Sequence, residues 1–235
     1  MLYITGDTHG ILSINRLNSR NFPEGQHLTK NDYVLITGDF GLVFLNNHVE
    51  KCWRKWLDDS PWTTLFIDGN HENHGLLDSY PITDWRGGKI HVISDSIFHL
   101  MRGQVYTLAI NDFKAIKIFT FGGADSDDKQ WRTGASWWSR EMPSKAEYEE
   151  GIGNLERHNW EVDYVFSHTV PTSCLSILND YRIIPRLPNR LTHFLQMIYN
   201  KTTFTKWYHG HMHVDLDYKM GKVRAIYEDI VVIDN

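Results

Sequence analysis

Three short apolar runs in the first third of the chain each end in a turn that contains a glycine and a polar residue. The runs occupy residues 2–4, 33–36 and 64–67, and the turns carry Gly6-Asp7, Gly38-Asp39 and Gly69-Asn70-His71. Each run is apolar, β-branched or aromatic and has the length of a buried strand. Residues 47–58, between the second and third runs, place apolar side chains at helical spacing. This alternation predicts an α/β fold with a largely parallel sheet that helices cover on both faces.

The rest of the chain predicts further strands and helices. We interpret residues 89–92, 97–100, 104–110 and 114–121 as antiparallel strands of a second sheet or of an edge of the first. Later strands are expected at residues 162–166, 204–208, 214–219, 223–227 and 230–233, and later helices at 144–158, 172–180 and 191–199. Ser144 and Glu147 have the spacing of a capping box. Residues 122–143 are polar, Trp-rich and poorly periodic, which is typical of a functional loop. No repeat or linker interrupts the chain, so we expect a single domain over residues 1–235.

Composition excludes several classes of protein. Hydrophobic residues make up 41% of the chain and aromatic residues 13%, which is enough for a sizeable core. The net charge of -5 and the lack of a long basic run disfavour binding to a long nucleic acid by electrostatics. The chain has no apolar stretch of about 18 residues and no basic leader before its first apolar run, so we expect a cytoplasmic protein without a membrane span. Cys52 and Cys174 are expected to be buried free thiols.

Polar residues gather where the predicted strands end. In chain order they are Asp7, His9, Asp39, Asn70, His71, His168, His211 and His213. In open α/β sheets, ligands bind outside the carboxyl ends of the strands. We therefore expect these side chains to meet at one edge of the fold, although they span most of the sequence.

The chemistry of this set predicts a site for two metal ions. Imidazole nitrogens combined with carboxylate and amide oxygens suit Mn, Fe, Zn or Co, and they do not suit Ca or Mg alone. One ion takes about four to six ligands, so Asp7, His9, Asp39, Asn70, His168, His211 and His213 imply two ions that share one carboxylate. His211 and His213 lie two residues apart, so each can face a different ion.

Each of these patterns alone has an ordinary structural explanation. The sequence Gly-Asp-Thr-His-Gly at residues 6–10 is compatible with a simple turn after a strand, and Asn70 with a helix N-cap. His168 alone is more typical of a hydrogen-bonded core or surface histidine than of a ligand. The order of the whole set, with each element placed after a strand, favours the metal site.

Five segments of the chain resemble the signature blocks of the calcineurin-like metallophosphoesterases, and the loop from Gly122 to Arg132 with the pair Trp137-Trp138 is similar to loops of bacterial and phage-type members. The five segments are Gly-Asp-Thr-His-Gly at 6–10, Gly-Asp-Phe-Gly at 38–41, Gly-Asn-His-Glu at 69–72, Ser-His at 167–168 and Gly-His-Met-His at 210–213. The resemblance implies a metallo-dependent phosphatase-like fold, which is a four-layer αββα sandwich of two mixed sheets. It also implies that Asp7, His9 and His213 bind one ion, and that Asn70, His168 and His211 bind the other. Asp39 would bridge the two ions, and His71 would protonate the leaving group or stabilise the transition state.

One departure from the family pattern concerns the second block. In the protein-phosphatase branch this block continues to an Asp-Arg pair, and this chain has Leu42 and Val43 at those positions. The machinery by which that branch grips a phosphoprotein is therefore absent.

Basic and aromatic residues elsewhere offer possible substitutes. Arg132 either contacts the phosphate of the substrate or makes salt bridges within the loop. A tryptophan of this loop can stack on a base, but we favour tryptophans packed beneath the loop. Arg182, Arg186 and Arg190 follow His168 and either line the site or lie on the solvated surface, and we favour the solvated surface for each.

The sequence thus predicts a hydrolase that cleaves a phosphate mono- or diester with a hydroxide bridging two transition-metal ions, of which Mn, Fe and Zn fit best. The expected substrate is a phosphorylated small molecule, a nucleotide or a phosphoprotein. Two alternatives remain open. One is a nuclease or cyclic-nucleotide phosphodiesterase, and the other is a metal-binding regulatory module without catalysis.

Overall fold

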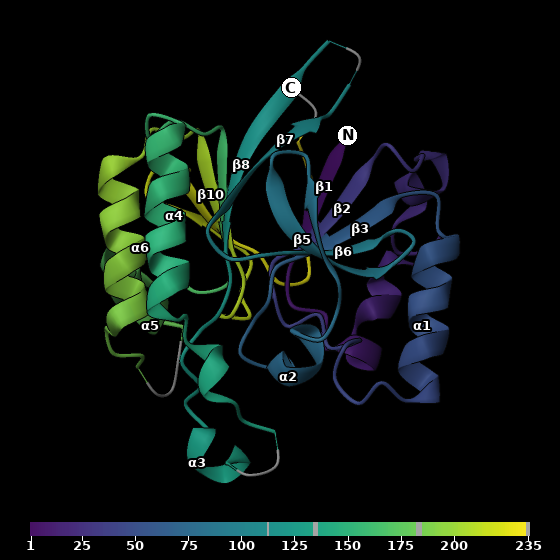
Figure 1. Ribbon diagram of the computed structural model, residues 1–235, viewed down its shortest axis with the longest axis horizontal. Helices are drawn as coiled ribbons and strands as arrows, with labels where there is room; N and C mark the ends of the chain where they lie inside the picture. The colour runs from purple at the N-terminus through teal and green to yellow at the C-terminus, as the bar shows by residue number, and fades with distance from the viewer. Residues whose placement is uncertain (112, 134–135, 182–184, 234–235) are drawn as a thin grey trace.

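The computed structural model describes residues 1–111, 113–133, 136–181 and 185–233. Within these residues the strands form a seven-stranded and a six-stranded sheet. Helices lie on the outer sides of the two sheets (Figure 1). Both sheets are mixed, and the arrangement is the four-layer αββα sandwich that the family resemblance implied. The prediction that helices cover both faces of one sheet is wrong, because the inner face of each sheet packs against the other sheet.

The first sheet has the order β13-β1-β2-β3-β6-β5-β4. Its parallel centre consists of β1 (Leu2–Thr5), β2 (Tyr33–Ile36), β3 (Thr63–Phe66) and β6 (Ile97–Leu100). Antiparallel strands flank this centre, namely β13 (Ile230–Ile233) on one side and β5 (Gly88–Ser94) and β4 (Ile82–Trp85) on the other. The antiparallel prediction for the strand at residues 97–100 is therefore half right, because β6 is antiparallel to β5 and parallel to β3.

The second sheet has the order β11-β12-β10-β9-β8-β7. Its parallel strands are β8 (Ala115–Phe121), β9 (Tyr164–Ser167), β10 (Lys206–His209) and β12 (Val223–Ala225). Its antiparallel edges are β7 (Gln104–Ala109) and β11 (Leu216–Tyr218). The expected antiparallel pairing of residues 104–110 with 114–121 is confirmed, with Val105 opposite Phe119.

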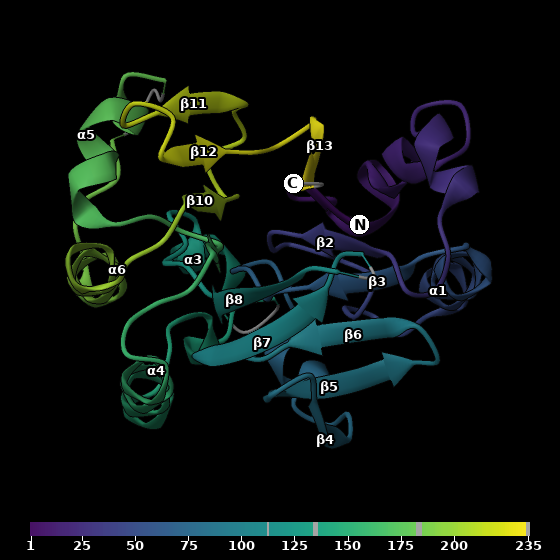
Figure 2. The same cartoon turned by 90° about the horizontal axis from the view of Figure 1, so that it is seen from above.

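Two groups of helices enclose the sheets (Figure 2). The helices α4 (Lys145–Arg157), α5 (Thr172–Asn179) and α6 (Arg190–Lys201) lie beside the second sheet. The helix α1 (His48–Asp59) and the 3₁₀ turns η1 (Gly10–Leu12), η2 (Ile14–Leu17) and η3 (Pro23–His27) lie beside the first. Ser144 and Glu147 form the predicted capping box of α4.

The core has three layers because the side chains of a strand alternate between its two faces. Leu35 of β2 packs between the sheets, in a cluster with Ile118 and Phe166 of the second sheet. The neighbouring Val34 and Ile36 pack outward, in a cluster with Leu57 of α1. A third cluster joins the second sheet to its helices.

Three features of the described residues bear on the remaining expectations. None of the described helices is both long enough and apolar enough to span a membrane. Cys174 is buried and free as expected, whereas Cys52 is free but exposed, because it lies on the outer side of α1. The described part of the loop at residues 122–143 is mostly irregular and includes the short α3 (Lys129–Arg132) and η4 (Ser139–Glu141).

Candidate metal centre

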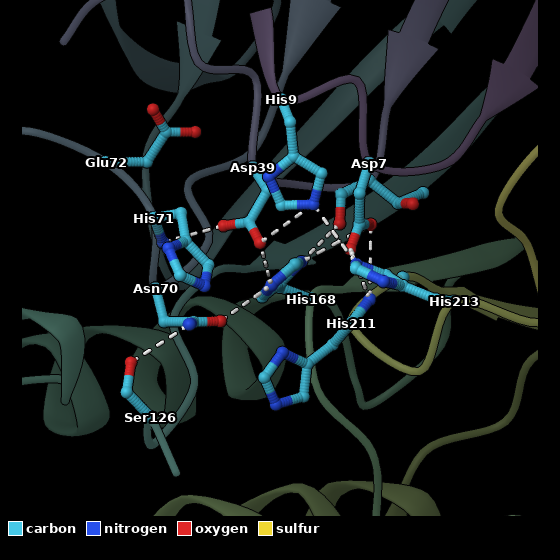
Figure 3. A network of polar contacts seen from close by, with 12 residues as sticks. Asp7, His9, Asp39, Asn70, His71, Glu72, Ser126, His168, His211 and His213 are labelled. Carbon is cyan, nitrogen blue, oxygen red and sulfur yellow. Dashed lines mark hydrogen bonds and ion pairs between the residues drawn. The ribbon is translucent and has the colours of Figure 1, made fainter. Parts of the chain in front are cut away.

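The predicted site residues come from the carboxyl ends of five parallel strands, three in one sheet and two in the other. Asp7 and His9 follow β1, Asp39 follows β2, and Asn70 and His71 follow β3. His168 follows β9, and His211 and His213 follow β10. Figure 3 shows that these residues gather in one place, as expected where the carboxyl ends of parallel strands meet.

The backbone at this edge adopts conformations that L-residues rarely take. Four of the predicted ligands have positive φ: 45° at His9, 47° at Asp39, 67° at His211 and 52° at His213. Such conformations cost about 1–3 kcal/mol each, and they are concentrated at functional sites. Their occurrence at four ligand positions indicates that the fold places these side chains at an energetic cost.

Two close approaches explain the glycines of the second block. A Cβ on Gly38 would lie 2.1 Å from Nδ1 of His168, and a Cβ on Gly41 would lie 2.4 Å from the main-chain nitrogen of Gly10. Both glycines also have positive φ, 111° and 71°. The block therefore needs glycine at both positions so that the loops after β1, β2 and β9 can pack together.

Four side chains form one compact group of donors. Asp7, His9, Asp39 and His213 each offer an atom, and these atoms all lie within 4.8 Å of one another. Nε2 of His213 is 3.2 Å from Oδ2 of Asp7 and 3.1 Å from Nε2 of His9. Nε2 of His9 is 3.8 Å from Oδ2 of Asp39. These are the three residues that the resemblance assigns to the first ion, together with the shared carboxylate.

A second group lies on the other side of Asp39. Nε2 of His168 is 3.5 Å from Oδ2 of Asp39 and 3.2 Å from Oδ1 of Asn70. Nδ1 of His168 lies 2.8 Å from the carbonyl oxygen of Thr37. A hydrogen bond to a carbonyl requires a proton on Nδ1, so Nε2 is the ring nitrogen that faces Asp39 and Asn70 and that would bind a metal ion.

His211 is placed differently from the other histidines. Its main-chain N–H donates to the carboxylate of Asp7, at 3.0 Å from Oδ2. Its ring lies beside that of His168, with 4.8 Å between centroids, and in Figure 3 it extends away from the carboxylates of Asp7 and Asp39. The ring of His211 therefore contacts the second group at the ring of His168, and the main-chain N–H of His211 positions the carboxylate of Asp7.

The carboxylate of Asp39 and the imidazole of His168 stabilise each other's charged form. Burial alone would raise the pKa of Asp39, but His168, with His71 and His9, holds that pKa below its usual range. Burial alone would lower the pKa of His168, but Asp39 and Asp7 raise it to about 9. The pKa of His71 is lowered, mainly by burial, which Asp39 opposes and Arg132 reinforces.

A clamp from the loop at residues 122–143 fixes the amide of Asn70. Nδ2 of Asn70 donates to Oγ of Ser126 at 2.9 Å, and Oγ of Ser126 donates to Oε2 of Glu141 at 2.5 Å. Nη1 of Arg132 also donates to Oγ of Ser126, at 2.9 Å. The hydroxyl has one proton, which it gives to Glu141, so it can only accept from Asn70. The amide oxygen of Asn70 is thereby turned toward His168. Sequence reasoning missed Ser126 and Glu141, because no local pattern indicates a contact across more than 50 residues.

The arginines of the sequence analysis have distinct positions. Arg132 has a 10% exposed side chain and donates within the loop and to the carbonyl oxygen of Asn70, which matches the loop-forming alternative. Its role in substrate binding stays a prediction. Arg186 is not on the solvated surface as expected, because its side chain is only 15% exposed and lines the cavity at the site while pairing with Asp127. Arg190 lies over the ring of Tyr148, and Arg182 falls outside the described residues.

The tryptophans of the loop do not share one environment. Trp138 packs edge-on against Phe44, with 5.7 Å between ring centroids. Trp131 is 89% exposed, so the expectation that the tryptophans pack beneath the loop is wrong for this residue.

A cavity of about 290 Å³ opens beside the two donor groups. Its lining includes Asp39, Asn70, His71, Asp127, Asp128, Arg186, His211 and His213.

Leu42 and Val43 lie in the core under α1, with exposures of 0% and 1%. No charged side chain enters the site from the positions of the absent Asp-Arg pair.

The donor set fits transition-metal ions. Asp7 and Asp39 are almost completely buried, with exposures of 0% and 1%, and imidazole nitrogens surround their oxygens. Paired carboxylates and imidazoles within this distance of one another are ligands of Mn, Fe and Zn. The exposed side of the first group, formed by His213 with a 48% exposed side chain, leaves a path from solvent.

A comparison with protein families identifies the family of the chain. The sequence model of the family described as calcineurin-like phosphoesterase matches residues 2–215. No curated protein matches the chain significantly. Among solved structures, the chain is similar to a phosphopantetheinyl hydrolase from Mycobacterium tuberculosis, with 14% identity and a TM-score of 0.45. That match covers 96% of this chain and 87% of the other.

Proposed function

Because the chain belongs to the calcineurin-like phosphoesterase family, a family of metal-dependent hydrolases, we propose that it hydrolyses a phosphate mono- or diester of a small molecule with two transition-metal ions bound. One observation carries the proposal. The loops of five strands, from both sheets, place carboxylate, amide and imidazole groups around the buried carboxylate of Asp39, with His9 and His168 at 3.8 and 3.5 Å from its Oδ2.

The residues divide into two sets of ligands. Asp7, His9 and His213 would hold one ion, and Asn70, His168 and His211 would hold the other, with Asp39 shared. Mn, Fe and Zn suit these donors. When bound, such ions neutralise charge on phosphoryl oxygens and activate water for attack.

The remaining residues of the site would position and protonate the substrate. The main-chain N–H of His71 donates to Oδ1 of Asp39 at 2.8 Å, which fixes this histidine at the edge of the site. Its imidazole lines the cavity and would give a proton to the departing oxygen. The cavity of about 290 Å³ is at the lower end of the usual size for small-molecule sites, which favours a small phosphorylated molecule or nucleotide over a phosphoprotein.

The direct test is an assay of the purified protein against model phosphate mono- and diesters, with Mn²⁺ and after chelation. We expect hydrolysis with the metal and its loss with the chelator. Cyclic nucleotides in the same assay distinguish a cyclic-nucleotide phosphodiesterase, and absence of turnover on every ester by metal-loaded protein would favour the regulatory module instead.

A second test addresses His71. We expect His71→Ala to retain both metals and to lose activity by about 10²–10⁴-fold, because it removes a proton donor and no ligand. Metal content measured by elemental analysis provides the control. Turnover at the rate of the parent by the metal-loaded variant would refute the assigned role.

A further inference from the structure

A second hollow, of about 340 Å³, adjoins the metal centre on the side of His9 and His71. We call it the apolar groove, and its other main walls are Ile11, Phe44, Leu45 and Val49. It lies between η1, the loop that follows Gly41 and the first turn of α1. His71 lines both this groove and the cavity that holds the donor groups.

The groove presents little charge to a ligand. Glu50 is the one carboxylate among the described residues that line it. Its oxygens accept from the main-chain N–H groups of Phe44, Leu45 and Asn46, at 3.1, 2.7 and 2.9 Å. Three main-chain donors thus satisfy this carboxylate, and only 7% of its side chain is exposed. The carboxylate shapes the loop and is not available to bind a polar ligand.

Large apolar side chains are exposed at the mouth of the groove. The exposures of Ile11, Leu45 and Val49 are 58%, 69% and 48%. Single exposed apolar residues are ordinary, but a group of them beside a site is typical of a surface that binds an apolar ligand or partner. Phe44, one of the walls, packs edge-on against Trp138, with 5.7 Å between ring centroids.

We infer that the apolar groove receives the leaving alcohol of the substrate, and that this alcohol is apolar. The inference rests on the proposed function and names the class of ester that the same site cleaves. The group that protonates the departing oxygen must lie next to the leaving group. His71 lies between the metal centre and the groove, so an alcohol that leaves toward His71 enters the groove.

The reaction is an ordinary hydrolysis. The oxygen of a water molecule bonds to phosphorus, and the bond between phosphorus and the oxygen of the alcohol breaks. The departing oxygen takes the proton of His71, and the proton that the water releases restores the protonation of the site. The products are the free alcohol and the phosphate, or the phosphate monoester when the substrate is a diester.

The test compares two esters whose phenols have similar acidity, phenyl phosphate and 2-naphthyl phosphate, each as the monoester and as the methyl diester. We expect the Mn²⁺-loaded parent to prefer the naphthyl ester by about tenfold in kcat/KM, because the second ring is buried in the groove. Equal specificity constants for the two leaving groups would overturn the inference.

Matched variants connect the preference to the groove. Leu45→Asp and Val49→Asp put a charge on its walls at exposed positions, and Val49 lies in the first turn of α1, where a carboxylate is favourable. Leu12→Asp is the control, because Leu12 is 78% exposed next to Ile11 and does not line the groove. We expect the first two variants to lose most of the naphthyl preference that the parent and Leu12→Asp both show, with Mn²⁺ content unchanged. A preference that survives in both would overturn the inference.

A binding measurement separates this inference from the proposed function. We expect 2-naphthol to bind the metal-free parent and Leu12→Asp in isothermal titration calorimetry, and to bind Leu45→Asp and Val49→Asp at least about tenfold more weakly. Binding that is equal in all four proteins would overturn the groove assignment, even if the esters are hydrolysed. Groove-dependent binding without hydrolysis of any ester would instead contradict the proposed function.

Discussion

At the scale of single residues, the site depends on side chains whose orientation other side chains determine. Asn70 illustrates this, because an amide can present either its oxygen or its nitrogen to a metal. The hydroxyl of Ser126 donates to Glu141 and accepts from Asn70 and Arg132, which leaves the oxygen of Asn70 for His168. Ser126 is therefore a positioning residue for a predicted ligand.

This arrangement predicts the effect of Ser126→Ala. We expect metal affinity to fall by about 10–100-fold, the usual cost of removing a partner that orients a ligand. Calorimetric titration with Mn²⁺ measures the affinity directly. Ser139→Ala provides a matched control, since Ser139 is an exposed serine of the same loop. Equal affinity in parent and Ser126→Ala would show that Asn70 needs no such clamp.

At the scale of elements, a buried ion pair connects the end of β3 with the loop at residues 122–143. Nε of Arg102 donates to Oδ2 of Asp68 at 2.9 Å, and its Nη2 donates to the carbonyl oxygen of Arg140 at 2.8 Å. Arg102 and Asp68 have side-chain exposures of 3% and 2%. The pKa of Asp68 lies well below its usual range, because Arg102 and His99 outweigh the effect of burial.

Removal of one partner of this ion pair should therefore lower the stability of the folded protein. We expect Arg102→Met to lower the free energy of unfolding by about 3–5 kcal/mol, because it leaves the buried charge of Asp68 with His99 but without its arginine counterion. The double variant with Asp68→Asn should recover part of that loss. Urea unfolding measures both, with the exposed Arg20→Met as control. A loss below about 1 kcal/mol would mean that the pair does not hold the two elements together.

Glu141, in η4, makes the stability of this loop depend on pH. Burial raises its pKa to about 7, although Ser126 and Arg132 oppose the shift. Between the ordinary value of 4.5 and about 7, the folded protein keeps a proton that the unfolded chain has lost, so the contribution of Glu141 to stability falls as pH rises. We expect the metal-free parent to lose up to about 1.4 kcal/mol per pH unit over this window, relative to Glu141→Gln. Parallel curves of unfolding free energy against pH for the two proteins would contradict this.

At the scale of the whole molecule, local patterns predict the buried strands and the gathering of the site residues, whereas only the family resemblance implied the two-sheet sandwich. Apolar runs such as those before Asp7 and Asp39 can only be buried strands, and the carboxyl ends of parallel strands meet at one edge. That argument needs only local patterns and topology, so it places His168 and His213 near Asp7 without any tertiary information. The family match over residues 2–215 agrees with it.

The features that the sequence does not predict are contacts between loops. Arg186 is drawn into the site by the carbonyl oxygen of Asp125 and by Asp127, about 60 residues away, and a lone arginine has no pattern that signals such a partner. The direction of the His211 ring and the positive φ of His211 and His213 likewise depend on packing between the two sheets. The exposure of Cys52 and Trp131 shows the same limit, since an apolar residue type does not determine which side of a helix faces the core.

The central claim is that one buried carboxylate, Asp39, serves two metal ions. Equilibrium dialysis against Mn²⁺, followed by elemental analysis, tests it most directly. We expect two ions per chain in the parent and in His71→Ala, and fewer than one in Asp39→Asn, because that substitution weakens both sites together. A single ion in the parent, or two ions retained at parental affinity in Asp39→Asn, would contradict the account.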